Sequence, residues 1–193
     1  LVSPEFFFEH VKVSNLIIDT PLGIRISELL NDVVRRLPDE EQFKMKGMIC
    51  INTRDQAREF WRKMGSKVGI MPDLESIQKD GNCVYLYGNT VDNSHYTITI
   101  IVDNLETRTD GYIVGLLAHE IAEMSYPFRK LMENLPSLKK MKPRARQVMM
   151  DRLTQNSTKS SQEHKEHENA VNREAARLGF EKEIVAMDGN AAF

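Results

Sequence analysis

The chain has 193 residues, of which 41% are hydrophobic and 28% are charged, so it can bury a sizeable core and lacks the composition of a disordered protein. Its formal net charge of -2 argues against binding nucleic acid over a broad surface. Two cysteines do not make a disulfide framework, and no apolar run reaches the length of a membrane span or has the flanks of a signal peptide. We therefore expect a cytoplasmic protein, and we give residues 1–6 no functional weight.

The first part of the chain, residues 1–80, has the pattern of a helical scaffold. Pro21 and Ser27 are both suitable starts for a helix, because apolar residues then recur at helical spacing as far as Leu37. Pro38 ends this pattern, since proline cannot continue a helix.

A strand, a helix and a pair of strands are predicted next. The segment "GMICI" has the character of a short buried strand, and Thr53 can cap a following helix that Gly65 can end. The segments "NCVYLYGN" (82–89) and "HYTITIIVDN" (95–104) are rich in β-formers and are joined by a loop of hairpin type. Alternation in the second segment predicts one buried face.

Two further helices follow. Asp110 is a suitable N-cap for "GYIVGLLAHEIAEMSY", which is apolar on most sides and so predicts a core helix that ends before Pro127. After the linker-like "TQNSTKSSQ", a polar helix covers "EHKEHENAVNREAARLGF", with Gly179 as its C-cap. This order of elements predicts a single α+β domain over 1–193, in which residues 81–180 carry the functional core.

The core helix contains a motif with metal-binding chemistry, "GLLAHEIAEM". His119 and Glu123 are four residues apart and therefore share one face of the helix, with Glu120 projecting beside them. Zinc hydrolases use this layout: two side chains one turn apart hold the metal, and the intervening glutamate takes a proton from metal-bound water.

Such a site needs a third protein ligand, which leaves the fourth position for water. The last helix offers His164, His167 and Glu168. Glu168 shares a face with His164 and also with Asn172, which lies one turn further on.

The segments "AHEIAE" and "EHENAVNREAARLGF" together resemble the zincin metallopeptidases of the gluzincin type, which pair an HExxH motif with a later helix of pattern ExxxN or ExxxD. The resemblance covers roughly residues 82–180. It implies an α+β zincin-like fold, with a small antiparallel β-sheet, an active-site helix and a following helix that carries the glutamate ligand. It also implies a peptide or protein substrate, which could add as a strand beside residues 95–104.

The resemblance assigns roles to individual positions. His119 matches the first ligand, Glu120 the general base, Glu168 the third ligand and Asn172 the residue that supports the ligands one turn on. Glu123 stands where the family has histidine. A His-Glu-Glu set is chemically possible and harder than the usual one, so we expect zinc, or manganese or iron(II) with less selectivity.

Three alternatives stay open at the level of sequence. Glu123 can mark a degenerate site that binds no metal, in which case the fold would serve as a binding or regulatory module. His164 or His167 can replace the missing ligand, although charged residues at helical spacing more commonly form a solvated face. A helical adaptor could use a basic segment that lacks the interleaved aromatic residues typical of nucleic-acid binding, and that consists of Lys139, Lys140, Lys142, Arg144 and Arg146.

Overall fold

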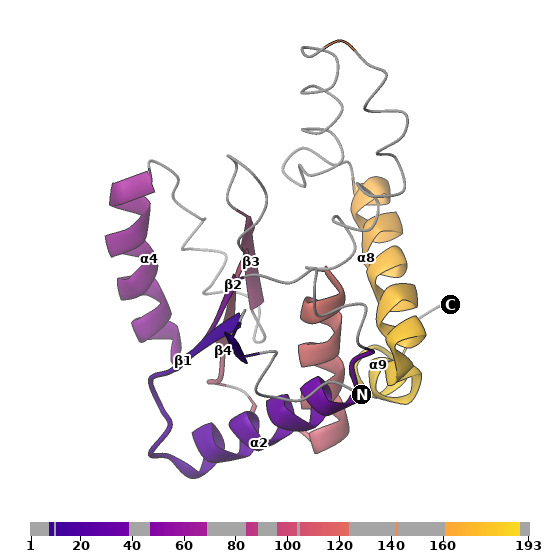
Figure 1. Cartoon of the computed structure of the whole chain (residues 1–193), viewed down its shortest axis with the longest axis horizontal. Coiled ribbons are helices and arrows are strands. Elements are labelled where there is room, and N and C mark those ends of the chain that lie inside the picture. Colours follow the sequence, from indigo (N-terminus) through magenta and orange to yellow (C-terminus); the bar gives the residue numbers. More distant parts are fainter. Residues whose placement is uncertain are drawn as a thin grey trace.

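The computed structural model of the chain describes residues 8–9, 11–38, 47–68, 84–88, 96–103, 105–123, 142 and 161–189. In these ranges, helices cover both faces of a mixed β-sheet (Figure 1). The chain therefore has the α+β content that the sequence predicts.

The sheet contains β1 (Val11–Asn15), β2 (Gly47–Asn52), β4 (Tyr96–Ile101) and β3 (Val84–Gly88), in that spatial order. The first three are parallel to one another, and β3 runs antiparallel to β4. The prediction of a small antiparallel sheet is therefore wrong for the sheet as a whole. The reason is that helix α2 (Pro21–Arg36) returns the chain to the starting end of β1 before β2 begins, which leaves these two strands parallel.

The strand pair of β3 and β4 is antiparallel, as a hairpin-type connection requires. However, β4 pairs with β2 on one side and with β3 on the other. An extended peptide cannot add beside β4, contrary to the expectation from sequence. Among the strands that the structure describes, only β1 and β3 have an unpaired edge.

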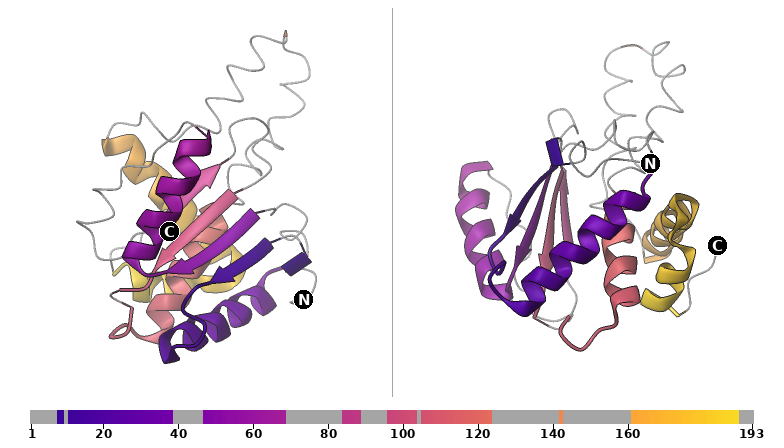
Figure 2. Two further views of the ribbon diagram at one scale, coloured as in Figure 1. Left: turned by 90° about the vertical axis from the view of Figure 1, so that its left-hand side faces the viewer. Right: turned by 60° about the horizontal axis from the view of Figure 1, so that its bottom comes forward.

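Both faces of the sheet are buried. Ile49 and Ile51 of β2 lie in one hydrophobic cluster with α2 and with the helix over residues 110–123. The alternate residue Cys50 and its neighbour in register, Thr99, point to the opposite face, which α4 (Arg54–Val68) covers (Figure 2). Thr99 has no exposed surface, so the prediction of a single buried face for β4 is wrong.

Helix α2 begins at Pro21, the first of the two predicted starts. The hydroxyl of Thr20 caps it by accepting a hydrogen bond from the Gly23 amide at 3.0 Å. The helix ends at Arg36, immediately before the predicted stop. Its buried face carries Ile26, Leu30, Val33 and Val34.

Helix α4 begins as predicted. The Thr53 hydroxyl accepts from the Gln56 amide at 3.4 Å, and the Gln56 side chain accepts from the Thr53 amide at 2.9 Å, which is the reciprocal pattern of a capping box. The helix continues to Val68, so the predicted end at Gly65 is wrong. A glycine inside a helix costs only about 1 kcal/mol relative to alanine, which does not by itself stop a helix.

The helix over residues 110–123 is the central helix of the molecule, and its residues 113–122 are all buried, as predicted. Its N-cap is Thr109, whose hydroxyl accepts from the Tyr112 amide at 3.2 Å. Asp110, the predicted cap, instead accepts two hydrogen bonds from the guanidinium of Arg25, which ties this helix to α2.

The C-terminal helices α8 (Ser161–Ala175) and α9 (Glu181–Met187) pack against the outer side of the 110–123 helix (Figure 2). The kinked segment η1 (Ala176–Phe180) joins them. Gly179 adopts a φ of 96° there, which suits the predicted cap, but the chain enters α9 directly instead of leaving the helix. No helix in the described part of the chain is long and apolar enough to cross a membrane.

Candidate metal centre

The side chains of His119, Glu120 and Glu123 gather on the last turns of the 110–123 helix. Each offers one ligand atom, and these atoms all lie within 4.8 Å of one another. His119 and Glu120 are each only 7% exposed. The helix is buried along almost its whole length, so this polar group sits inside the packed part of the molecule and faces α8.

His119 is held between two residues of α8. Its Nδ1 lies 2.9 Å from Oδ1 of Asn172. An amide oxygen can only accept, so Nδ1 donates; Nε2 can donate to Glu168 while the imidazole is protonated, and it has a lone pair once that proton is lost. Nε2 in turn lies 3.3 Å from Oε2 of Glu168. Asn172 thus directs Nε2 towards Glu168, and a partner of this kind at the other ring nitrogen is common for metal-binding histidines.

The separation of His119 Nε2 and Glu168 Oε2 is that of an ion pair, and it is also compatible with two ligands of one metal ion. Two ligand atoms, each about 2.1 Å from a tetrahedral ion, lie about 3.4 Å apart. The observed 3.3 Å agrees with this spacing. The Glu168 side chain is 37% exposed, so an ion at this point would be reachable from solvent.

Glu123 also contacts α8. Its Oε1 lies 3.1 Å from Nε2 of His167, and the side chains of both residues are largely buried. The expectation of a solvated surface position is therefore wrong for His167. Sequence reasoning did not foresee this contact, because the rotation of α8 that brings Glu168 to His119 also determines where the preceding residue lies.

The pKa of Glu120 reflects first its burial and then the carboxylates around it. Burial and the charges of Glu123 and Glu168 raise this pKa to about 8, although His119 acts in the opposite direction. Burial alone would lower the pKa of His119, but its hydrogen bonds to Glu168 and Asn172 and the neighbouring carboxylates outweigh this effect and raise the pKa to about 9. Both shifts favour the protonated forms of these two side chains in the metal-free protein.

The structure brings together His119, Glu120, Glu123, Glu168 and Asn172, all of which the sequence identified. The side chain of His164 and the basic segment, apart from Lys142, lie outside the described residues. A predicted role for any of them stays a prediction.

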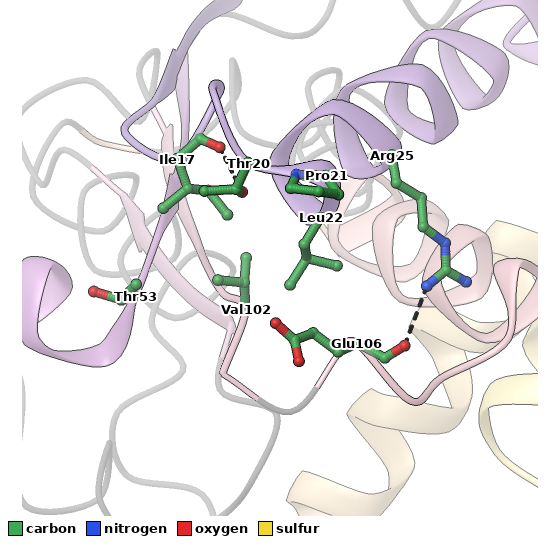
Figure 3. A pocket seen from close by; sticks show the side chains of 8 residues that line it. All are labelled: Ile17, Thr20, Pro21, Leu22, Arg25, Thr53, Val102 and Glu106. Carbon is green, nitrogen blue, oxygen red and sulfur yellow. Dashed lines mark hydrogen bonds between the residues drawn. The ribbon is translucent and has the colours of Figure 1, made fainter.

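A separate pocket of about 390 Å³ lies where β1, β2 and β4 end, beside the starts of α2 and α4 (Figure 3). Its walls include Ile17, Leu22 and Val102, and the Glu106 carboxylate points into it. Arg25 also lines it, but its guanidinium bonds to Asp110 and to backbone carbonyls. At a rise of about 1.5 Å per residue, His119 lies about 15 Å along the helix from the N-cap, so this pocket is not part of the metal centre.

Comparisons with known protein families, with curated proteins and with solved structures find no match to this chain.

Proposed function

We propose that this protein is a metal-dependent hydrolase of zincin type that cleaves peptide bonds. The observation that carries the proposal is the double contact of His119, with Asn172 at Nδ1 and with Glu168 at Nε2. Glu168 and Asn172 lie one turn apart on α8, and Glu123 lies one turn beyond His119. Glu168 thus contacts His119 from α8, and Glu123 lies with His119 and Glu120 in the cluster on the 110–123 helix, which supports these residues as candidate ligands.

His119, Glu123 and Glu168 would hold the ion, and one position would remain for water. Two carboxylates and one imidazole form a hard donor set. We therefore propose zinc, with manganese or iron(II) as alternatives, since oxygen-rich sites discriminate less strongly against these ions. An ion bound here would polarise the substrate carbonyl and make its bound water more acidic.

Glu120 is the proposed general base. Its carboxyl has a pKa of about 8 in the metal-free protein, and the charge of a cation held beside it would lower that pKa and so ionise it at neutral pH. Its carboxylate lies within 4.8 Å of the ligand atoms of His119 and Glu123, which is a suitable distance from a water on the same ion. Glu120 accepts a proton as the water oxygen bonds to the carbonyl carbon. It then delivers this proton to the leaving nitrogen as the C–N bond breaks, so that the carboxylate is regenerated.

The test separates metal binding from catalysis. The purified full chain is loaded with zinc or manganese, bound metal is measured by mass spectrometry, and hydrolysis of casein is followed. We expect about one ion per chain. Glu120→Gln should keep the ion and lose activity by roughly 10²-fold or more, as expected for removal of a general base. His119→Ala should lose both.

Glu166→Gln provides a matched control, because this glutamate lies on α8 and is exposed. It should change neither metal content nor activity. Activity in Glu120→Gln equal to that of the wild type would refute the proposed mechanism.

A second candidate function is a zincin-like binding or regulatory module without catalysis. Glu123 favours it, because this position departs from the HExxH pattern. Wild-type protein that takes up neither zinc nor manganese, and whose behaviour is unaffected by changes at Glu120 and Glu168, would support this candidate over the enzyme.

A further inference from the structure

We propose that His167 is the positioning residue for Glu123 and that it makes a glutamate usable as a metal ligand at this position. This inference rests on the proposed function, because it assumes that Glu123 binds the ion. It starts from the 3.1 Å contact between His167 Nε2 and Glu123 Oε1.

The contact restricts the Glu123 carboxylate without consuming it. A carboxylate has about four lone-pair sites on its two oxygens, so one hydrogen bond from His167 to Oε1 does not prevent the group from also binding metal. The side chains of His167 and Glu123 are only 10% and 13% exposed, so water competes little for this hydrogen bond. A donor here also withdraws charge from Glu123, which lies close to the carboxylate of Glu120.

The same helix supports both ligands of the 110–123 helix. Asn172 accepts from His119, and His167 contacts Glu123, while Glu168 lies between these two supports in the sequence and reaches the metal position itself. Metal-binding side chains are generally oriented by such partners, and a histidine ligand commonly has a carboxylate partner. In this site the two roles are exchanged: the carboxylate of Glu123 is the proposed ligand, and the histidine, His167 on α8, is its partner.

The exchange of roles gives a physical reason for a glutamate at position 123. A histidine at position 123 would face His167 across the helix interface. Glutamate instead gains a hydrogen bond there, so residues 123 and 167 form one functional unit. The unit predicts that changes at the two positions are strongly coupled in metal binding.

The experiment compares metal affinity in variants of the metal-free full chain, titrated separately with Zn²⁺ and Mn²⁺. His167→Phe keeps a ring of similar size but has no donor, and we expect it to weaken both metals roughly 10- to 100-fold. His167→Gln places an amide donor near the position of Nε2, and we expect it to restore affinity to within roughly threefold of the wild type. Lys165→Ala, an exposed change on the same helix, is the control and should have no effect.

A double-mutant cycle with Glu123→Gln completes the test. In that background we expect His167→Phe to have little further effect, because the pair is already broken. Thermal melting of the metal-free variants identifies any that do not fold, and His167→Ala replaces His167→Phe in the cycle if the larger ring is not tolerated.

Two results would overturn the inference while the proposed function stands. One is a His167→Phe protein with wild-type affinity. The other is a His167→Gln protein as weak as His167→Phe, because this would make the histidine a ligand in its own right. Wild-type protein that binds neither metal would instead refute the proposed function itself.

Discussion

Replacement of Gly115 by alanine should move the 110–123 helix, which carries His119 and Glu123, away from the C-terminal helices, which carry Glu168. Gly115 lies one turn before His119, where the 110–123 helix crosses the backbone of α9. A Cβ atom built at Gly115 falls 2.8 Å from the carbonyl carbon of Glu183 and closer still to its oxygen, and 3.0 Å from Cβ of Met187. The first two neighbours are backbone atoms, so they cannot move aside by a change of rotamer.

The size of the effect follows from these contacts. Carbon atoms prefer separations of at least about 3.5 Å, so α9 must move away by roughly 0.7 Å or more. Overpacking of this kind costs about 1–3 kcal/mol, and the higher helix propensity of alanine returns up to about 1 kcal/mol. We therefore expect Gly115→Ala to lower the free energy of unfolding by about 1–2 kcal/mol. The displacement should also weaken metal binding, because α8 is continuous with α9 through η1.

Urea denaturation of the metal-free protein measures the first effect. With a slope of about 2 kcal/mol per M, the midpoint should fall by roughly 0.5–1 M. Gly111→Ala is the matched control on the same helix, because its Cβ would lie 3.7 Å from Cβ of Ala186, an ordinary contact. It should be neutral or slightly stabilising. A Gly115→Ala protein as stable as the wild type would refute this account of how the helices pack.

Three further predictions concern titratable groups. Because the pKa of His119 is raised to about 9, a metal must displace the proton of this ligand at neutral pH. Metal affinity should therefore increase from pH 6 to pH 9, and calorimetry should detect proton release; an affinity independent of pH would contradict this. The hydrogen bond and charge of Arg36, 2.6 Å away, hold the pKa of Glu183 below its usual value. Solvent screens this partly exposed pair, so it should stabilise the fold by up to about 1 kcal/mol at pH 7, where the carboxylate is ionised in both states. The contribution should fade as the pH falls below the unfolded value of 4.5. Glu183→Gln should therefore lower the urea midpoint at pH 7 and have much less effect at pH 3, and an equal loss at both pH values would count against it. Finally, burial raises the pKa of the Cys50 thiol to about 11. In a variant whose other cysteine is replaced, a thiol reagent should therefore react slowly with the folded protein at pH 8 and rapidly in urea. Rapid reaction of the folded protein would contradict burial of this thiol.

The local structure around the metal centre was predictable because short-range rules determine it. The i, i+4 spacing places His119 and Glu123 on one helix face, and Glu168 and Asn172 on another, whatever the rest of the chain does. The apolar character of "GYIVGLLA" is enough to indicate a buried helix. These features needed no knowledge of the tertiary structure.

The features that the sequence did not predict depend on how helices and strands pack against one another. The parallel order of β1 and β2 depends on the direction in which α2 returns the chain, which the alternation of apolar residues in a strand does not report. Burial of Thr99 depends on α4 covering the second face of the sheet. The contact between His167 and Glu123 depends on the rotation of α8 about its axis, and charged neighbours at helical spacing hide that rotation in the sequence.

The position of a bound metal ion tests the central claim most directly. Crystals of the full chain grown with zinc can be measured at the zinc absorption edge, where anomalous scattering locates the ion. We predict one peak about 2.1 Å from Nε2 of His119, with carboxylate oxygens of Glu123 and Glu168 at similar distances. A zinc-saturated crystal with no peak at this point, or with a peak held by other residues, would contradict the account.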